Sequence, residues 1–211
     1  MQIRYLGHSC FEFTTKNGTK IITDPYTKVG YELPNGLFAD VLTISHAHFD
    51  HNYFQGIKTN AIISQTGEYT LNDVKILGIE CDHDPEKGKL RGKNIIFKII
   101  VDDLILCHMG DVGEECSPQL IEKIGEVDLL FIPVGGTYTI DALGAKKYIE
   151  QINPKTVIPM HYKPLDGALD IASITSFLDI YKDKPTKMVL DGVTEINTPT
   201  NEIIYMERVN K

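Results

Sequence analysis

Residues 39–51 read ADVLTISHAHFDH, a short apolar run that leads at once into three histidines and an aspartate. The run ADVLTIS has the length and the continuous apolar character of a strand buried on both faces. It predicts a strand that ends directly at the HAHFDH motif of residues 46–51. Because loops positioned by a rigid scaffold often carry binding and catalytic residues, this junction is the first candidate for function.

The pattern on both sides of this junction predicts two β-rich runs combined with helices. Strand-like segments and an Asn17-Gly18 turn precede it. Further strand-like segments follow at residues 61–65, 74–81, 94–101, 104–110, 127–136, 156–162, 187–192 and 202–209. Ser117 and Asp141 are expected to cap helices, and residues 171–181 form another amphipathic stretch. This order predicts an α/β (α+β) fold in which sheets pack together with helices outside.

Composition predicts one compact domain over residues 1–211. Hydrophobic residues make up 42% and charged residues 24% of the chain, close to the averages for globular domains. The formal net charge of −8 argues against nucleic acid as a partner, because phosphate-backbone binding needs a clustered basic surface. No apolar run approaches the ~18 residues of a membrane span and no signal peptide is evident, so we expect a cytoplasmic protein with no membrane partner.

The four cysteines are expected to be reduced thiols, because they are widely spaced and form no CxxC motif. They are Cys10, Cys81, Cys107 and Cys116. Cys81 and Cys107 lie close to histidines, which raises the alternative of a thiolate metal ligand. Both stand in strongly apolar segments, where a cysteine more often behaves as a small core residue.

The other four of the seven histidines also lie near predicted segment ends. They are His8, His83, His108 and His161, and Asp111 follows His108 closely. Imidazoles and carboxylates brought together from several strands are the ligands of many protein metal sites. A shuffled chain of this composition would contain HxHxDH with a probability of about 6 in 10,000, so chance explains the cluster poorly. The alternative for the cluster is that its members are solvated polar residues or caps of the following turn. The alternative for His8 and His108 is that each is a hydrogen-bonded histidine without a ligand role.

HAHFDH after a buried strand, followed by His83, Asp111 in HMGD and His161 in PMHY, resembles the metal-binding motifs of the metallo-β-lactamase superfamily in order and spacing. The resemblance covers nearly the whole chain. More narrowly, YLGHS, TDP at residues 23–25 and VIPMHY are similar to the small metal-dependent hydrolases related to ascorbate-phosphate lactonase. The resemblance implies a four-layer αβ/βα sandwich of two mixed β-sheets flanked by helices, with the site at one edge between the sheets.

The resemblance also implies a site for two divalent metal ions. The expected ligands are His46, His48 and His83 for the first ion, Asp50, His51 and His161 for the second, and Asp111 as a bridge. Histidine and carboxylate ligands suit zinc, and also manganese or iron. A water between two such ions becomes a hydroxide nucleophile near neutral pH. Asp50 is the carboxylate expected to orient it and shuttle its proton, and the alternative is a purely structural ligand.

Four further residues are candidates for roles beside the metals. His108 is a candidate donor that holds a ligand carboxylate in its binding geometry. His8 is a candidate for substrate contact or for protonation of the leaving group, so both histidines are candidate catalytic residues. Tyr162 and Lys163 are candidates for binding substrate, through an oxyanion or a phosphate, with ordinary solvated positions as the alternative.

Together these features predict a metal-dependent hydrolase that uses a metal-bridging hydroxide to cleave a small ester, lactone or phosphoester. His48 stands where the redox di-iron branch of the superfamily has a glutamate, which argues against an oxygen- or nitric-oxide-reducing role. The alternatives are a phosphodiesterase of cyclic nucleotides or lipid head groups, and a metal-stabilised binding or sensing module. The loops expected to enclose the small-molecule substrate are residues 28–38, 83–93 and 135–141. The sequence leaves the substrate and the oligomeric state open.

Overall fold

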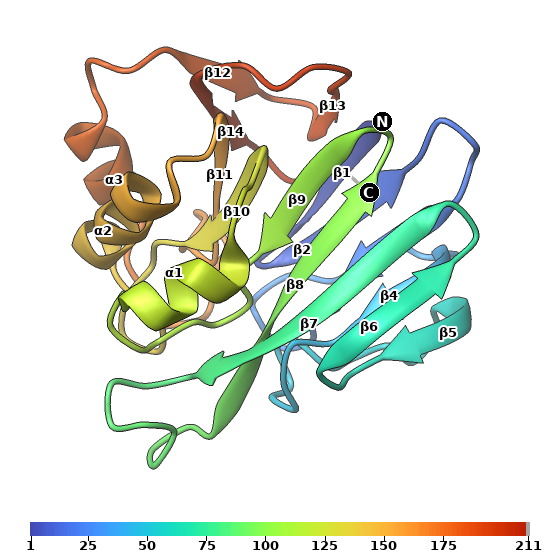
Figure 1. The fold of residues 1–211 in the computed structure, drawn as a ribbon, viewed down its shortest axis with the longest axis horizontal. Helices are drawn as coiled ribbons and strands as arrows, with labels where there is room; N and C mark the ends of the chain where they lie inside the picture. Colours follow the sequence, from blue (N-terminus) through green and yellow to red (C-terminus); the bar gives the residue numbers. More distant parts are fainter. Residues whose placement is uncertain (210–211) are drawn as a thin grey trace.

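The computed structural model describes residues 1–209, and its strands form two mixed β-sheets (Figure 1). The first sheet has the strand order β13-β1-β2-β3-β4-β5. Its strands are β1 Gln2–Gly7, β2 Cys10–Thr14, β3 Lys20–Thr23, β4 Phe38–Thr43, β5 Lys58–Ile63 and β13 Val193–Glu195. Strands β3, β4 and β5 pair in parallel, and the other pairs are antiparallel.

The second sheet has the strand order β12-β14-β11-β10-β9-β8-β7-β6. Its strands are β6 Gly67–Leu71, β7 Val74–Asp82, β8 Lys93–Val101, β9 Leu104–His108, β10 Leu129–Pro133, β11 Thr156–Met160, β12 Thr186–Val189 and β14 Glu202–Met206. Strands β6 to β9 pair as antiparallel neighbours, and the remaining pairs are parallel. Asp102 and Asp103 form the turn between β8 and β9 and both adopt left-handed φ values, 54° and 63°, as a two-residue hairpin loop requires.

The helices are α1 Pro118–Ile124, α2 Ala142–Ile152 and α3 Thr175–Ile180, and they lie together beside the second sheet (Figure 1). The two predicted caps are confirmed. Ser117 Oγ accepts from the N–H of Leu120 at 3.3 Å, and Asp141 Oδ1 accepts from the N–H of Gly144 at 2.8 Å. No helix within residues 1–209 is long and apolar enough to cross a membrane.

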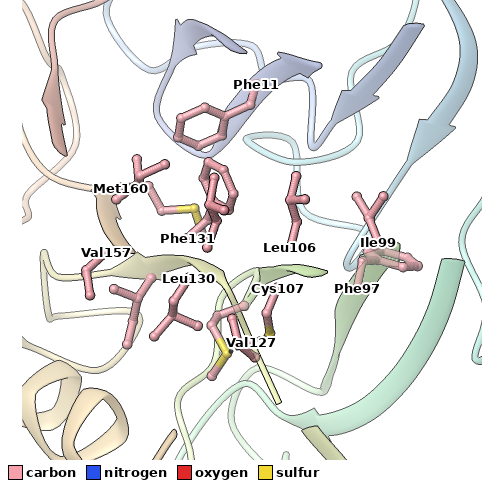
Figure 2. Packing of buried hydrophobic residues seen from close by; sticks show 14 of the residues in the cluster. Phe11, Phe97, Ile99, Leu106, Cys107, Val127, Leu130, Phe131, Val157 and Met160 are labelled. Atoms are coloured by element: carbon pink, nitrogen blue, oxygen red, sulfur yellow. Dashed lines mark hydrogen bonds between the residues drawn. The ribbon is translucent and has the colours of Figure 1, made fainter. Parts of the chain in front are cut away.

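The main hydrophobic core lies between the two sheets and continues between the second sheet and the helices. Figure 2 shows Phe11 of β2 facing Phe131 of β10, with ring centroids 4.8 Å apart, and Leu130 pointing to the opposite side of β10. Every residue of β10 is buried, because one face of that strand meets the first sheet and the other meets the helix layer.

A second, smaller core covers the other face of the first sheet. Successive strand residues alternate between the two cores, as Tyr5 and Leu6 do in β1. Tyr26, Val29 and Leu37, from the segment between β3 and β4, complete this second core. The predicted class, two mixed sheets with flanking helices, is confirmed. On the outer face of the first sheet, the long loop between β3 and β4, rather than a helix, forms the outer layer within the described residues.

The topology brings the carboxyl ends of six strands to one edge of the sandwich. Strands β1, β3 and β4 run in the same direction in the first sheet, as the alternation of antiparallel and parallel pairs requires. Strands β7, β9 and β11 run in one direction in the second sheet for the same reason. Loops that follow these strands therefore meet where the two sheets face each other, which places the candidate site.

Asp73 joins the two sheets away from this edge. Its carboxylate, in the turn between β6 and β7, accepts from Thr15 Oγ1 at 3.1 Å, from Asn17 Nδ2 at 2.9 Å and from Thr19 Oγ1 at 2.7 Å. We expect Asp73→Ala to lower the free energy of unfolding by about 1 kcal/mol, because partial exposure weakens each bond. Urea unfolding measures the loss, with the exposed Asp179→Ala as a control expected to change stability little. Equal stability of the two variants would contradict this role.

Candidate metal centre

The structure brings all seven predicted metal ligands together at the edge where the strand ends meet. The HAHFDH motif follows β4, His83 follows β7, Asp111 follows β9 and His161 follows β11. The candidate ligand atoms fall into three groups, within each of which all atoms lie within 4.8 Å of one another. These groups are His46, His48 and His83; His46, His51 and Asp111; and His8, Asp50, His51 and His161.

Asp111 lies at the centre of the cluster, with its two carboxylate oxygens directed to different histidines. Oδ1 is 3.0 Å from His51 Nε2. Oδ2 is 3.2 Å from His161 Nε2, 3.5 Å from His83 Nε2 and 3.9 Å from His46 Nε2. A carboxylate in contact with the histidines of both predicted triads has the position that a bridging ligand requires.

Asp24, to which sequence analysis assigned no role, fixes the orientation of two of these histidines. His51 Nδ1–H donates to Asp24 Oδ2 at 2.9 Å, and Ser45 Oγ–H donates to the same oxygen at 2.6 Å. Because the hydroxyl hydrogen of Ser45 is used in this way, His46 Nδ1–H donates to Ser45 Oγ at 2.9 Å. Both imidazoles therefore direct Nε2 into the cluster. The signal in the sequence was a carboxylate directly after the buried strand β3, within TDP.

Asn94, also missed from the sequence, holds the loop that carries Asp111. Asn94 Oδ1 accepts from the N–H of Asp111 at 2.8 Å, and its Nδ2 donates to the carbonyl of Met109 at 2.9 Å. Gly110 between them has φ 53°, and a Cβ there would lie 2.4 Å from Asn94 Oδ1. The glycine of HMGD is therefore required both by the left-handed backbone and by the close amide.

The chemistry of the cluster fits a bound cation. Eleven buried side-chain nitrogen and oxygen atoms within residues 1–209 have no hydrogen-bond partner, and seven of them belong to this cluster. They are Nε2 of His8, His46 and His51, Nδ1 of His83, both ring nitrogens of His161, and Oδ1 of Asp111. Buried polar atoms without a partner are rare in proteins and costly, so their concentration here indicates a missing charged partner. Nitrogen donors with carboxylates suit zinc, manganese or iron.

The ionisation states of these side chains also suit a bound cation. Burial lowers the pKa of His46 to about 3 and the pKa of His8 to about 4, so both are neutral near pH 7. Burial raises the pKa of Asp111, but His161 and His51 outweigh that effect and hold it well below its usual range. Burial lowers the pKa of His51, but Asp111 and Asp24 raise it well above its usual range. A cation that binds His51 must therefore displace a proton, and binding weakens in acid.

The structure separates the two additional histidines. His8 joins the cluster, with Nε2 3.4 Å from Asp50 Oδ2. His108, the last residue of β9, is fully buried and donates from Nε2 to the carbonyl of Ser9 at 2.8 Å, while its Nδ1 accepts from the N–H of Gly110 at 3.3 Å. Nε2 therefore ties the second sheet to the turn after β1, and Nδ1 holds the backbone of the loop that carries Asp111, so a catalytic role for His108 stays a prediction.

The two predicted substrate-binding residues lie in different environments. Tyr162 is buried, and its hydroxyl donates to the carbonyl of Met206 at 2.8 Å. Burial raises the pKa of this hydroxyl, whose hydrogen is directed to Met206, and binding of substrate by Tyr162 stays a prediction. Lys163 is exposed and lines a surface cavity of about 380 Å³ with Tyr31, Tyr205 and Arg208. Its role in binding substrate stays a prediction.

All four cysteines are free thiols, as predicted. Cys81 Sγ accepts from Asn94 Nδ2 at 3.1 Å. Cys107 is completely buried in the main core, and burial raises its pKa to about 12. A protonated, buried thiol is a poor metal ligand, so the alternative of thiolate ligation at Cys107 is disfavoured.

Two of the predicted substrate loops contact each other beside the cluster. Arg91, in the loop after His83, donates from Nη2 to the carbonyl of Thr137 at 3.2 Å and places its guanidinium 5.7 Å from the ring centroid of Tyr138. Asp84 organises the same loop, because its carboxylate accepts from the N–H groups of Glu86, Gly88, Leu90 and Arg91. These contacts connect residues 83–93 and 135–141 into one rim.

We expect Asp24→Asn to weaken zinc binding by about 10- to 100-fold, because the amide loses the charged acceptor that orients His51 and, through Ser45, His46. Asparagine tolerates the left-handed φ of 40° at this position, so the fold is retained. Competition titration with a chromogenic chelator measures the affinity. Ser45→Ala leaves the contact between Asp24 and His51 intact and is expected to lose less zinc affinity than Asp24→Asn. Wild-type affinity in Asp24→Asn would refute the orienting role.

A two-sheet sandwich with histidines and aspartates gathered at the strand ends defines the metallo-β-lactamase type of protein. The model of the Beta-lactamase superfamily domain matches residues 2–161, and the chain belongs to this family. A crystal structure from Thermotoga maritima, described as a candidate zinc-dependent hydrolase of the metallo-β-lactamase superfamily, is 35% identical. The match covers 97% of both chains with a TM-score of 0.80.

Two relatives named UPF0173 metal-dependent hydrolase are also similar to the chain. They come from Carboxydothermus hydrogenoformans and Thermococcus onnurineus. Each is 28% identical, and the match covers 77% of this chain and 84% of the relative. The family that the sequence motifs predicted is therefore confirmed.

Proposed function

We propose that this protein is a dinuclear metal-dependent hydrolase of a small ester, lactone or phosphoester. The observation that carries the proposal is the convergence of six histidine and aspartate side chains around the central carboxylate of Asp111. The similarity to proteins named metal-dependent hydrolases supports the same reaction class. The donor set suits zinc best, with manganese and iron as further candidates.

The residues of the chain divide into two sets around Asp111. His46, His48 and His83 would hold one ion, and Asp50, His51 and His161 would hold the other. When bound, two divalent ions would supply an activated water near neutral pH and polarise the substrate oxygen under attack. The hydrogen bonds from Asp24 and Asn94 keep His51 and Asp111 oriented for this task.

Asp50 is the carboxylate that would act on the attacking water. Its Oδ2 lies 3.4 Å from His8 Nε2 and 3.9 Å from His51 Nε2. Burial raises the pKa of Asp50, but His8 and His51 lower it below its usual range, so the side chain is ionised at neutral pH. A carboxylate in this place accepts a hydrogen bond from the water, takes its proton at an Oδ atom and returns it to the leaving-group oxygen.

The rim of the site supports a small substrate with an apolar part. The exposed apolar side chains Phe49, Leu90 and Tyr138, with exposed fractions of 49%, 67% and 36%, stand on three loops that follow strands at this edge. Apolar walls with a few polar groups are typical of small-molecule sites. Together with the net charge of −8, they favour a small molecule over nucleic acid. The main core shared by both sheets supports treating residues 1–211 as one domain. The cytoplasmic location stays a prediction.

A panel of p-nitrophenyl esters, lactones, phosphomonoesters and phosphodiesters tests the proposal with zinc- or manganese-reconstituted protein. We expect turnover of at least one ester, lactone or phosphoester, lost on chelation and restored by the metal. Turnover confined to phosphodiesters would favour the phosphodiesterase alternative. A metal-loaded protein that binds ligands tightly and turns over none of them would favour a sensing module. Failure to bind any metal on reconstitution would overturn the proposal.

A further inference from the structure

His8 combines two energetically unfavourable features, and the seven predicted metal ligands do not explain either of them. It lies in the turn between β1 and β2 with φ 55°, a left-handed conformation that is uncommon outside glycine. Its side chain is 1% exposed, and its Nε2 has no hydrogen-bond partner. Strained backbone and an unsatisfied buried nitrogen persist only where another interaction compensates for them.

The surroundings of His8 hold its backbone in this conformation. The carbonyl of His8 accepts from Tyr5 OH and from the N–H of His161, both at 3.0 Å. The preceding Gly7 has φ 112°, and a Cβ there would lie 2.7 Å from the ring of Tyr31. The same hydrogen bond ties His8 to His161, which has a matching left-handed φ of 53°. This hydrogen bond thus joins two histidines that have left-handed backbones and follow strands of different sheets.

The ring of His8 points into the second half of the cluster. Its centroid is 4.1 Å from that of His161 and 5.1 Å from that of His51. Its Nε2 approaches Asp50 Oδ2 to 3.4 Å but makes no hydrogen bond there. Ligand atoms of His8, Asp50, His51 and His161 all lie within 4.8 Å of one another. Imidazole nitrogens and carboxylate oxygens of this kind are the usual ligands of zinc in proteins.

We propose that His8 is a further protein ligand of the metal held by Asp50, His51 and His161. The inference rests on the proposed metal centre. With the shared Asp111, the half that contains His8 would offer five protein ligands, and the half formed by His46, His48 and His83 would offer four. We therefore expect the two ions to differ in ligand number and in affinity.

Cobalt titration of the whole protein tests this assignment, because visible absorption of bound Co²⁺ reports the number and type of ligands independently of activity. The variant is His8→Gln, which keeps an N–H donor near the position of Nε2 but not the imidazole. We expect wild-type protein to bind two Co²⁺ ions per chain. His8→Gln should bind one with wild-type affinity and the other at least tenfold more weakly, with a changed absorption band.

Two matched variants separate ligation from other roles of a buried histidine. His8→Asn tolerates the left-handed backbone but cannot reach the cluster, and it is expected to lose the same ion. Thr156→Val removes a buried hydroxyl at the opposite end of β11 from His161, where it bonds to Thr200, and it should still bind two ions. Two ions bound by His8→Gln with wild-type affinity and absorption would overturn the role of His8 and leave the metal centre intact. A wild-type protein that binds no cobalt would instead overturn the centre itself.

Discussion

Asp50→Asn is expected to lower kcat by about 10²- to 10⁴-fold at saturating metal, because the amide cannot take a proton from the attacking water. The substitution keeps the size and a ligating oxygen, so the fold and the bound metal are retained. Initial rates with whichever substrate of the panel is turned over measure the loss, and metal analysis of the same sample shows that both ions are still bound.

The control for this variant is Asp82→Asn, next to the proposed ligand His83. Its carboxylate accepts from Lys93 Nζ at 2.6 Å and does not face the cluster, so kcat should change little. Full turnover in Asp50→Asn would refute the proposed role of this carboxylate. An equal loss in both variants would show that any charge removed near this edge lowers the rate.

Asp111→Asn is expected to have the largest effect on metal content. The carboxylate is 2% exposed and contacts histidines of both predicted triads through its two oxygens, and an uncharged amide with a single oxygen cannot serve both ions. We expect the number of bound ions to fall from two to one or none, with affinity for the remaining ion at least ~100-fold weaker. Mass spectrometry of metals after dialysis measures the content.

Thermal unfolding of Asp111→Asn gives a second readout. Ions that bind only the folded state stabilise it, so zinc should raise the Tm of wild-type protein and have little effect on the variant. Asp103→Asn, in the exposed turn between β8 and β9, is the matched control, because asparagine also tolerates its φ of 63°. Two tightly bound ions in Asp111→Asn would contradict a bridging role for this residue.

Many strands and helix starts of the fold could be predicted from local sequence patterns, because tertiary contacts agree with the local preferences there. The buried run at residues 39–45 leads into the HAHFDH motif as a strand, and the caps Ser117 and Asp141 begin α1 and α2 as expected. The strands β6 Gly67–Leu71 and β13 Val193–Glu195 were missed. β6 is a partly exposed edge strand with two polar residues among its five, and β13 has three residues, so neither shows a hydrophobic period.

The site was predictable in its ligand types and less so in the contacts around them. Histidines at strand ends indicate a metal, but the residue type does not tell which way a side chain turns. His108 is the last residue inside β9 and points to Ser9, whereas His161 lies just past β11 in a left-handed conformation and faces Asp111. Asp24 acts through hydrogen bonds between segments far apart in sequence, which no local pattern records.

Anomalous diffraction at the zinc edge, from crystals of the zinc-reconstituted protein, tests the central claim most directly. We predict two peaks ~3.5–4 Å apart at the edge of the sandwich. One should be bound by His46, His48 and His83 and the other by Asp50, His51 and His161, with Asp111 in contact with both. The absence of a peak within this cluster, or a single zinc ion there, would contradict a dinuclear hydrolase.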